Sequence, residues 1–341
     1  MAIDPFDPVV PKVNLHPGFR LLAEAPGYAP ARTIIRKVFE TFRDKDGNFL
    51  EQFQTTGFDA RTWELFLYVW LNNSDVQIDW DYASPDFCCR YKDIDFFIEA
   101  VTANPSPLDG SLSGLSVQDR QEKHRPIRLG SALYSKLQKR YWELPHVTGK
   151  PLVFAIEDFH APDSLAFGSS SLWQYLYGIR GSWWIDESGM LHIDEMSVME
   201  HRHGAKAIPS GFFKQACAEN ISAVIFGNSG TVAKFNRMGW VLGAARPQNV
   251  KMVRMGTCYD HTPNSPVPLV FHYNLEDTDA PIETWSQGLE IYHNPRAIAP
   301  LPLGFLSIAY HYHDGEKLHS YLPNFHPYGS RTIIMQIRDS D

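Results

Sequence analysis

Residues 75–102 decide the fold, and they read DVQIDWDYASPDFCCRYKDIDFFIEAVT. Within this stretch, residues 75–80 alternate apolar and polar side chains, which is typical of a half-buried strand. Residues 86–91 form a second short segment that follows Ser84-Pro85, and residues 96–101 form a third that is dominated by apolar side chains. The stretch therefore predicts three consecutive β-strands.

The segments on either side of these strands indicate helices. Large apolar side chains recur at three- and four-residue spacing over 63–71, which predicts a helix over 59–72 with Asp59 as its N-cap. Pro126 starts a second predicted helix, over 127–144, with Leu133 and Leu137 on its core face. The continuous apolar run 152–156 predicts a strand that is buried on both faces. This order of helix, three strands, helix and strand predicts an α/β fold with a mixed sheet flanked by helices.

The rest of the chain predicts one domain with two additions. Residues 1–30 hold six prolines, so we expect an irregular N-terminal arm that packs over the domain. Residues 31–245 form the predicted α/β domain, with a further hairpin at 182–195 and a further buried strand at 221–226. We expect residues 246–341 to form a C-terminal extension packed on the same domain.

Two carboxylates occupy chemically unusual places in the predicted strands. Asp86 follows Pro85 where the second strand begins, and Glu99 lies inside the apolar third strand. An isolated buried carboxylate is costly, and two that meet on neighbouring strands repel each other unless a divalent cation lies between them. Oxygen ligands of this kind favour magnesium or manganese. A turn position for Asp86 and a core salt bridge for Glu99 are the structural alternatives.

These residues carry a resemblance to a known family. With the predicted order of elements, with Glu64 in the first helix, and with Pro85-Asp86 and Glu99, residues 55–160 resemble the PD-(D/E)XK nuclease superfamily, which has the restriction-endonuclease-like fold. The resemblance implies hydrolysis of phosphodiester bonds in nucleic acid, with DNA favoured over RNA. It also implies that Asp86, Glu99 and the backbone carbonyl after Glu99 bind Mg²⁺ or Mn²⁺, with Glu64 as a further ligand. A solvated helix position is the alternative for Glu64.

The chain departs from the family pattern at one position. The family has a lysine two residues after the second acidic position, and this chain has Val101 there. A lysine would orient the attacking water and stabilise negative charge, which valine cannot do. At 100° per residue, the second helix would carry Lys136 and Arg140 towards the sheet. We therefore predict that Lys136, or failing that Arg140, supplies the missing cation beside Glu99.

Basic residues concentrate in two segments although the net charge of the chain is −8. Residues 119–140 hold seven lysines and arginines against two acids, and residues 220–259 hold five with no acid. Such segments can attract a polyanion to one surface of an acidic protein, although a solvated surface is the ordinary alternative. The predicted nucleic-acid contacts are Lys123, Arg125, Arg128, Lys234 and Arg237.

Composition and termini limit the remaining classes. Hydrophobic residues make up 44% of the 341 positions, which is enough for a substantial core and excludes a disordered chain. No apolar run reaches the roughly 18 residues that a transmembrane helix needs, so we expect no membrane partner. The N-terminus is acidic and proline-rich, unlike a secretory signal, and we expect a cytoplasmic protein.

Two functions follow from these patterns. The first is a metal-dependent nuclease in which Glu64, Asp86, Glu99 and Lys136 or Arg140 are catalytic. The second is a nuclease-like fold that has lost catalysis and serves as a nucleic-acid-binding or protein-interaction module, which Val101 in place of lysine favours. The position of Lys136 and Arg140 relative to the two acids distinguishes these hypotheses.

Overall fold

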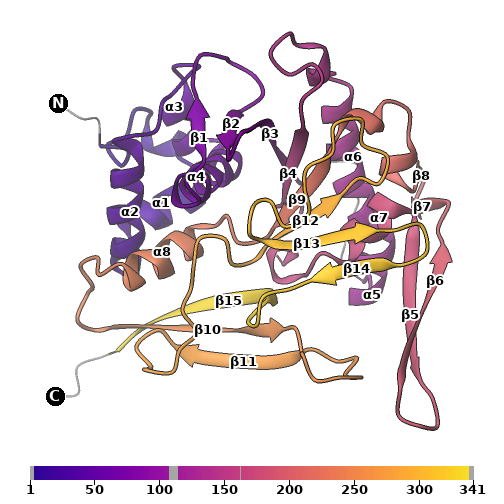
Figure 1. Ribbon diagram of the computed structural model, residues 1–341. Coiled ribbons are helices and arrows are strands. Elements are labelled where there is room, and N and C mark those ends of the chain that lie inside the picture. Colours follow the sequence, from indigo (N-terminus) through magenta and orange to yellow (C-terminus); the bar gives the residue numbers. More distant parts are fainter. Residues whose placement is uncertain (1–3, 107–113, 162, 338–341) are drawn as a thin grey trace.

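The computed structural model describes residues 4–106, 114–161 and 163–337. These residues form a mixed α/β structure in which an eight-stranded mixed sheet is flanked by helices (Figure 1). The predicted α/β class is therefore confirmed. Residues 1–3 of the predicted arm, residues 107–113 of the predicted domain and residues 338–341 of the predicted extension lie outside the described part of the chain.

The central sheet combines strands from three parts of the sequence. Its spatial order is β1-β2-β3-β4-β9-β12-β13-β14, with β3 parallel to β4, β4 parallel to β9 and β12 parallel to β13. The other neighbouring pairs are antiparallel. The strands are β1 (Gln77–Asp79), β2 (Phe87–Tyr91), β3 (Ile94–Ala103), β4 (Leu152–Asp158), β9 (Ala223–Gly227), β12 (Leu289–His293), β13 (Ala309–His313) and β14 (Leu318–Tyr321).

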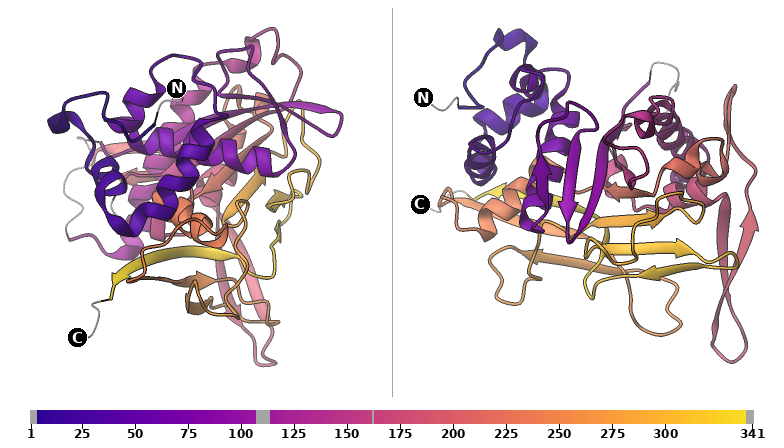
Figure 2. Two further views of the ribbon diagram at one scale, coloured as in Figure 1. Left: turned by 90° about the vertical axis from the view of Figure 1, so that its left-hand side faces the viewer. Right: turned by 45° about the horizontal axis from the view of Figure 1, so that its top comes forward.

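Helices cover both faces of this sheet, as Figure 2 shows. One face packs against α1 (Pro17–Glu24), α2 (Ala29–Phe39), α3 (Phe49–Gln54), α4 (Phe58–Asn73) and α8 (Val232–Val241). The other packs against α6 (Arg125–Leu137) and α7 (Ser170–Tyr177). Alternate residues of the buried strands enter the two cores: Ala155 faces α4, whereas Phe154 and Ile156 face α6.

The predicted order of helix, three strands, helix and strand is present as α4, β1, β2, β3, α6 and β4. The helix predicted over 127–144 is shorter, because α6 ends at Leu137 and only a 3₁₀ turn, η5 (Tyr141–Glu143), follows. Arg140 adopts a left-handed backbone conformation with φ of 53°, which a helix cannot continue through. A short α5 (Val117–Asp119) and a π-helical turn at 120–124 precede α6.

The N-terminal arm is more regular than its prolines predict. Pro17 is the first residue of α1, and His16 caps that helix by accepting a hydrogen bond from Gly18 N at 3.2 Å. Pro30 lies in the first turn of α2. Proline is tolerated in the first turn of a helix, where the missing N–H would have no partner within the helix. The prolines therefore mark helix starts in this arm.

The C-terminal segment is part of the main sheet as well as packing on it. It contributes β12, β13 and β14, and it also forms a second, three-stranded sheet in the order β11-β10-β15. These strands are β10 (Val250–Cys258), β11 (Leu269–Asn274) and β15 (Pro327–Gln336). Residue 245 is therefore no boundary within the central sheet.

Two antiparallel hairpins complete the strands. One pairs β5 (Ile179–Ile185) with β6 (Leu191–Ser197), and it projects from the body of the molecule in Figures 1 and 2. The other pairs β7 (Glu200–His203) with β8 (Lys206–Pro209). Across the residues that the structure describes, every helix is too short or too polar to cross a membrane.

Candidate active site

Asp86 and Glu99 meet at the end of the β2–β3 pair. The antiparallel register places Phe87 opposite Ile98, so Asp86, one residue before β2, lies opposite Glu99. Residues that are directly opposite in antiparallel strands face the same side of a sheet. The backbone N–H of Asp86 donates to Glu99 Oε2 at 3.3 Å, and Asp86 Oδ2 accepts from Ala100 N at 2.8 Å. The two acids therefore lie beside each other on neighbouring chain segments, and the cation expected to bridge their carboxylates stays a prediction.

Glu64 brings a third carboxylate to this place from α4. Its Oε2 accepts from Arg61, one turn earlier in the helix, at 2.7 Å. Burial raises the pKa of Glu64, and the nearby charge of Glu99 raises it further, although Arg61 opposes both effects. We call Glu64, Asp86 and Glu99 the carboxylate cluster.

Asp86 is the acid that this cluster perturbs most clearly. Burial raises its pKa well above the usual range, and the charges of Glu99 and Glu64 act in the same direction. The cation of Lys136 and the hydrogen bond from Ala100 N lower the pKa only in part. Burial and the neighbouring acids together outweigh these partners, so Asp86 takes up a proton more readily than a free aspartate.

Lys136 is the cation that α6 carries to the cluster. Its ammonium group donates to Glu99 Oε1, which confirms the prediction that this lysine reaches an acid of the site. Burial lowers the pKa of Lys136, but the charges of Glu99, Asp86 and Glu64 outweigh that effect and raise the pKa overall. The side chain remains 31% exposed, whereas that of Glu99 is 5% exposed. Lys136 thus stays charged at the edge of the site.

Arg140 does not reach the carboxylate cluster. Because α6 ends three residues earlier, the helical angle that predicted a sheet-facing Arg140 does not apply. Its guanidinium instead pairs with Glu143 at 2.6 Å, and both side chains are more than half exposed. The prediction for Arg140 is therefore corrected.

Two groups that the sequence analysis missed contact the cluster. Tyr141 OH donates to Glu99 Oε1 at 2.7 Å, from the turn that follows α6. Lys45 Nζ donates to the backbone carbonyl of Asp86 at 2.9 Å and lies 5.5 Å from the centre of the Trp80 ring. Neither residue stands in a recognisable motif. Only the fold brings them to Asp86 and Glu99.

A small pocket of about 40 Å³ opens at the cluster. Its lining includes Glu64 and Asp86, and residues of both charges around them: Arg43, Lys45 and Arg61, and Asp44 and Asp46. Arg43 is exposed and Lys45 is half-buried. Cations around an acidic centre are suited to the phosphates of a substrate that approaches it.

Three of the five cations in the basic segment 220–259 are buried. Lys234 and Arg237 are buried, and both pair with the buried Glu283 at 2.8 Å. Arg254 lies 3.4 Å from the same carboxylate and is also buried. We call these four residues the Glu283 cluster. The predicted phosphate contacts of Lys234 and Arg237 are thus corrected, because their charges are used inside the protein.

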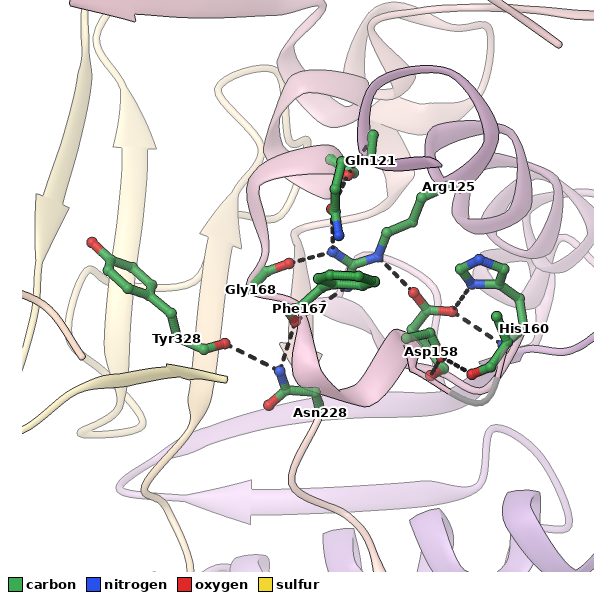
Figure 3. A network of polar contacts seen from close by, with 11 residues as sticks. Gln121, Arg125, Asp158, His160, Phe167, Gly168, Asn228 and Tyr328 are labelled. Carbon is green, nitrogen blue, oxygen red and sulfur yellow. Dashed lines mark hydrogen bonds and ion pairs between the residues drawn. The ribbon is translucent and has the colours of Figure 1, made fainter. Parts of the chain in front are cut away.

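The predicted contacts in segment 119–140 have different environments. Arg125 is buried in the polar network of Figure 3, where its Nε donates to Asp158 Oδ2 at 2.6 Å and another nitrogen contacts Gln121 Oε1 at 3.1 Å. It therefore ties the start of α6 to the end of β4 and cannot reach a nucleic acid. Lys123 is exposed and pairs with Asp119 at 2.6 Å, and Arg128 donates to the carbonyl of Asn104.

Figure 3 also shows further polar contacts at this end of the sheet. Asp158 Oδ1 contacts His160 Nδ1 at 2.5 Å, and the Asn228 amide donates to the carbonyls of Phe167 and Tyr328 at 2.7 and 3.1 Å. These bonds join the ends of β4 and β9 to β15. They stabilise the packing of the fold, and none of them involves a residue of the carboxylate cluster.

The donor set of the carboxylate cluster suits a hard divalent cation, because all three side chains supply oxygen and their combined charge is negative. Within residues 4–106, 114–161 and 163–337, however, no group of three or more His, Cys, Asp or Glu side chains is already arranged around an ion position. In the arrangement described here, Arg61 and Lys136 occupy one oxygen each of Glu64 and Glu99.

Comparison of the chain with protein-family models, with curated proteins and with solved structures finds no match. Any assignment of function to this site therefore depends on its geometry and chemistry.

Proposed function

We propose that the protein is a metal-dependent nuclease with a restriction-endonuclease-like core. The observation that supports this most directly is the meeting of Glu64, Asp86, Glu99 and Lys136, from α4, the start of β2, β3 and α6, at one end of a strand pair. Unbalanced carboxylates beside one lysine are suited to hydrolysis of a phosphodiester bond assisted by Mg²⁺ or Mn²⁺. DNA is the favoured substrate.

In this proposal Asp86 and Glu99 hold the cation, together with the carbonyl of Ala100, and Glu64 is a further ligand. A divalent cation held by these residues would supply positive charge for the phosphate in the transition state. Asp86 suits this task because burial, together with the charges of Glu99 and Glu64, disfavours its carboxylate and raises its pKa, and a bound cation would offset that penalty. Arg61 keeps Glu64 oriented through its bond of 2.7 Å.

In this proposal Lys136 supplies the cation that Val101 cannot supply. Val101 is buried with 2% of its surface exposed, so it faces the core behind the site. The ammonium group of Lys136 lies against Glu99, is partly exposed, and retains its proton. A fixed cation at this position orients the attacking water and stabilises negative charge on the phosphate. Tyr141 positions Glu99 through its hydroxyl.

Cleavage assays test the proposal. Purified protein is incubated with supercoiled plasmid, linear duplex, single-stranded DNA and RNA, each in Mg²⁺, Mn²⁺ or EDTA. We expect cleavage of at least one substrate in a divalent cation, none in EDTA, and loss of cleavage in Asp86→Asn. Asp81→Asn is the matched control, since Asp81 is an exposed acid in the loop that leads to Asp86. Equal cleavage by both variants would contradict the proposal.

Val101 favours a second function, a nucleic-acid-binding module without catalysis. It predicts that no substrate is cleaved in either cation while single- or double-stranded nucleic acid still binds. It also predicts that Lys136→Met leaves that binding largely intact, because Lys136 is occupied with Glu99. The cleavage and binding assays together therefore separate the two functions.

A further inference from the structure

A second, larger pocket of about 420 Å³ lies next to the carboxylate cluster. Its lining includes Cys88, two residues after Asp86, and Phe97, two residues before Glu99. Both side chains belong to the core that faces α6, so they lie on the same side of the sheet as Glu99. Because a strand rises about 3.3 Å per residue, this lining lies roughly 7 Å along the strands from the two acids. One nucleotide spans such a separation.

Aromatic rings form one wall of this pocket. Tyr82 and His146 are stacked, with ring centres 3.9 Å apart and planes inclined by 14°, and His146 meets Phe97 edge-on at 5.7 Å. A ring nitrogen of His146 also contacts the carbonyl of Ser84 at 2.8 Å. The stack is therefore fixed to the loop that carries Asp86. Tyr82 is 40% exposed and can accept another flat ring.

Polar side chains surround the aromatic wall. Gln77 and Asp79 of β1 supply an amide and a carboxylate, which match the donors and acceptors at the edge of a nucleobase. Arg90 and Lys150 both pair with Asp95, at 2.6 and 3.2 Å, and both are exposed at the rim. They place positive charge where the backbone of a bound strand would leave the pocket.

We propose that this pocket holds the unstacked base of the nucleotide next to the scissile phosphate, and that the substrate is single-stranded nucleic acid. The inference rests on the proposed nuclease function and adds its substrate class. A paired base in a duplex enters a pocket only if it is flipped out at the cost of its pairing and stacking, whereas a base in a single strand leaves the stack more easily and can lie against Tyr82. Stacking on an aromatic side chain tolerates any base, so it gives strand selectivity without sequence selectivity.

Binding measurements test the pocket without depending on cleavage. A fluorescein-labelled single strand is titrated in Mg²⁺ against Asp86→Asn protein, with Tyr82→Ala, Tyr82→Phe or Tyr134→Ala added. Loss of one stacking contact of about 1–3 kcal/mol predicts roughly 5- to 150-fold weaker binding in Tyr82→Ala. Tyr82→Phe keeps the ring and should bind as the parent does. Tyr134 is exposed on α6 and does not line the pocket, so Tyr134→Ala is the matched control.

Abasic sites locate the contact along the substrate. We expect one abasic position to weaken binding to the parent protein, and to have no further effect in Tyr82→Ala, because both changes remove the same stack. Unchanged binding of Tyr82→Ala, or an equal abasic penalty in both proteins, would overturn the pocket. Cleavage of fully paired duplex as fast as single strand would also overturn it.

The outcomes separate this inference from the function on which it rests. Binding that depends on Tyr82, in a protein that cleaves nothing, would keep the pocket and reject the nuclease. Metal-dependent cleavage that requires Asp86 but ignores Tyr82 would keep the nuclease and reject the pocket.

Discussion

Two charge clusters in this molecule have opposite compositions. The carboxylate cluster brings three acids to Lys136 and Arg61, with Lys45 on the backbone carbonyl of Asp86, whereas the Glu283 cluster brings one acid to three cations. Both are largely buried, so neither excess of charge is diluted by solvent. The two clusters differ in the bonds that the surrounding protein makes to their charged groups.

The Glu283 cluster is satisfied within the protein. Lys234 also donates to the carbonyl of Thr284 at 2.6 Å, Arg237 to Thr332 at 2.6 Å, and Arg254 to Ser330 at 3.1 Å. These bonds join α8 to the segment before β12 and to β15. Despite desolvation, the three cations hold the pKa of Glu283 well below its usual range. This cluster has the properties of a structural crosslink.

The carboxylate cluster keeps its excess of charge beside a surface pocket. Burial and the neighbouring acids raise the pKa values of Asp86 and Glu64, and Lys136 and Arg61 compensate them only in part. Buried charges that are all bonded within the protein are suited to a role in stability, whereas carboxylates beside a pocket are suited to the cation of the proposed function. The contrast between the clusters can be measured.

Loss of the Glu283 carboxylate should have the largest effect on stability. We expect Glu283→Gln to lower the free energy of unfolding by about 3–5 kcal/mol, because it leaves three buried cations without their anion. Urea unfolding measures the change. Glu276→Gln is the control, since Glu276 is half exposed and lies 3.8 Å from Arg246. A change below about 1 kcal/mol is typical of exposed ion pairs, and it would contradict the structural role of the Glu283 cluster.

Loss of the Lys136 ammonium should act on activity instead. We expect Lys136→Met to lower the cleavage rate about 10²- to 10³-fold, the usual effect of removing one fixed group that stabilises transition-state charge. Its stability should change little, because the side chain is partly exposed. Lys139→Met, at an exposed position three residues later, serves as the control and should cleave normally. Equal cleavage rates for the two variants would show that the ammonium group of Lys136 is not needed for cleavage.

Divalent cations should stabilise only one of the clusters. At a Mg²⁺ concentration of about 100 times the dissociation constant, the free energy of unfolding should rise by about 2.7 kcal/mol, and EDTA should reverse the gain. Thermal unfolding with and without the metal measures it. In Asp86→Asn the gain should disappear, whereas in Glu276→Gln it should persist. A gain of the same size in Asp86→Asn would place the bound cation elsewhere.

The smallest effect expected concerns Asp86 without metal. A carboxyl whose pKa is raised by folding stabilises the native state below its ordinary pKa, and that contribution is lost as pH rises through the raised pKa. Asp86→Asn should therefore be more stable than the parent in EDTA at pH 8, because the amide avoids the cost of a buried carboxylate whose pKa folding raises. The difference should be present at pH 8 and should shrink towards pH 4. A variant that is less stable than the parent at pH 8 would contradict the electrostatic account.

The sequence predicted the fold best where periodicity is strong and local. The alternating residues before Asp86 and the apolar stripe of the first helix depend on neighbours in the chain, and α4, β1, β2 and β3 were predicted to within a few residues. The end of α6 was wrong because it depends on the left-handed conformation of Arg140, for which no glycine or asparagine gives a signal. The three strands that follow residue 288 have no local pattern strong enough to show that they join the main sheet.

The site was predictable where it depends on pairing of adjacent strands. Asp86 and Glu99 could be placed opposite each other because a short hairpin fixes their register. Lys234 and Arg237 could not be interpreted correctly, since their partner Glu283 lies 46 to 49 residues further along the chain. Counting charges along a segment cannot distinguish a basic surface from a set of buried ion pairs.

The order of strands in the main sheet determines when each strand can pair with its neighbour during synthesis of the chain. Strand β9 is complete at Gly227, but its outer neighbour β12 begins only at Leu289. At roughly 5–20 residues per second, a ribosome exposes that open strand edge for several seconds. An unpaired edge of apolar residues is a template for aggregation. We expect arrested chains from which residues 289–293 have left the ribosome to resist limited proteolysis better than arrested chains that end before Leu289.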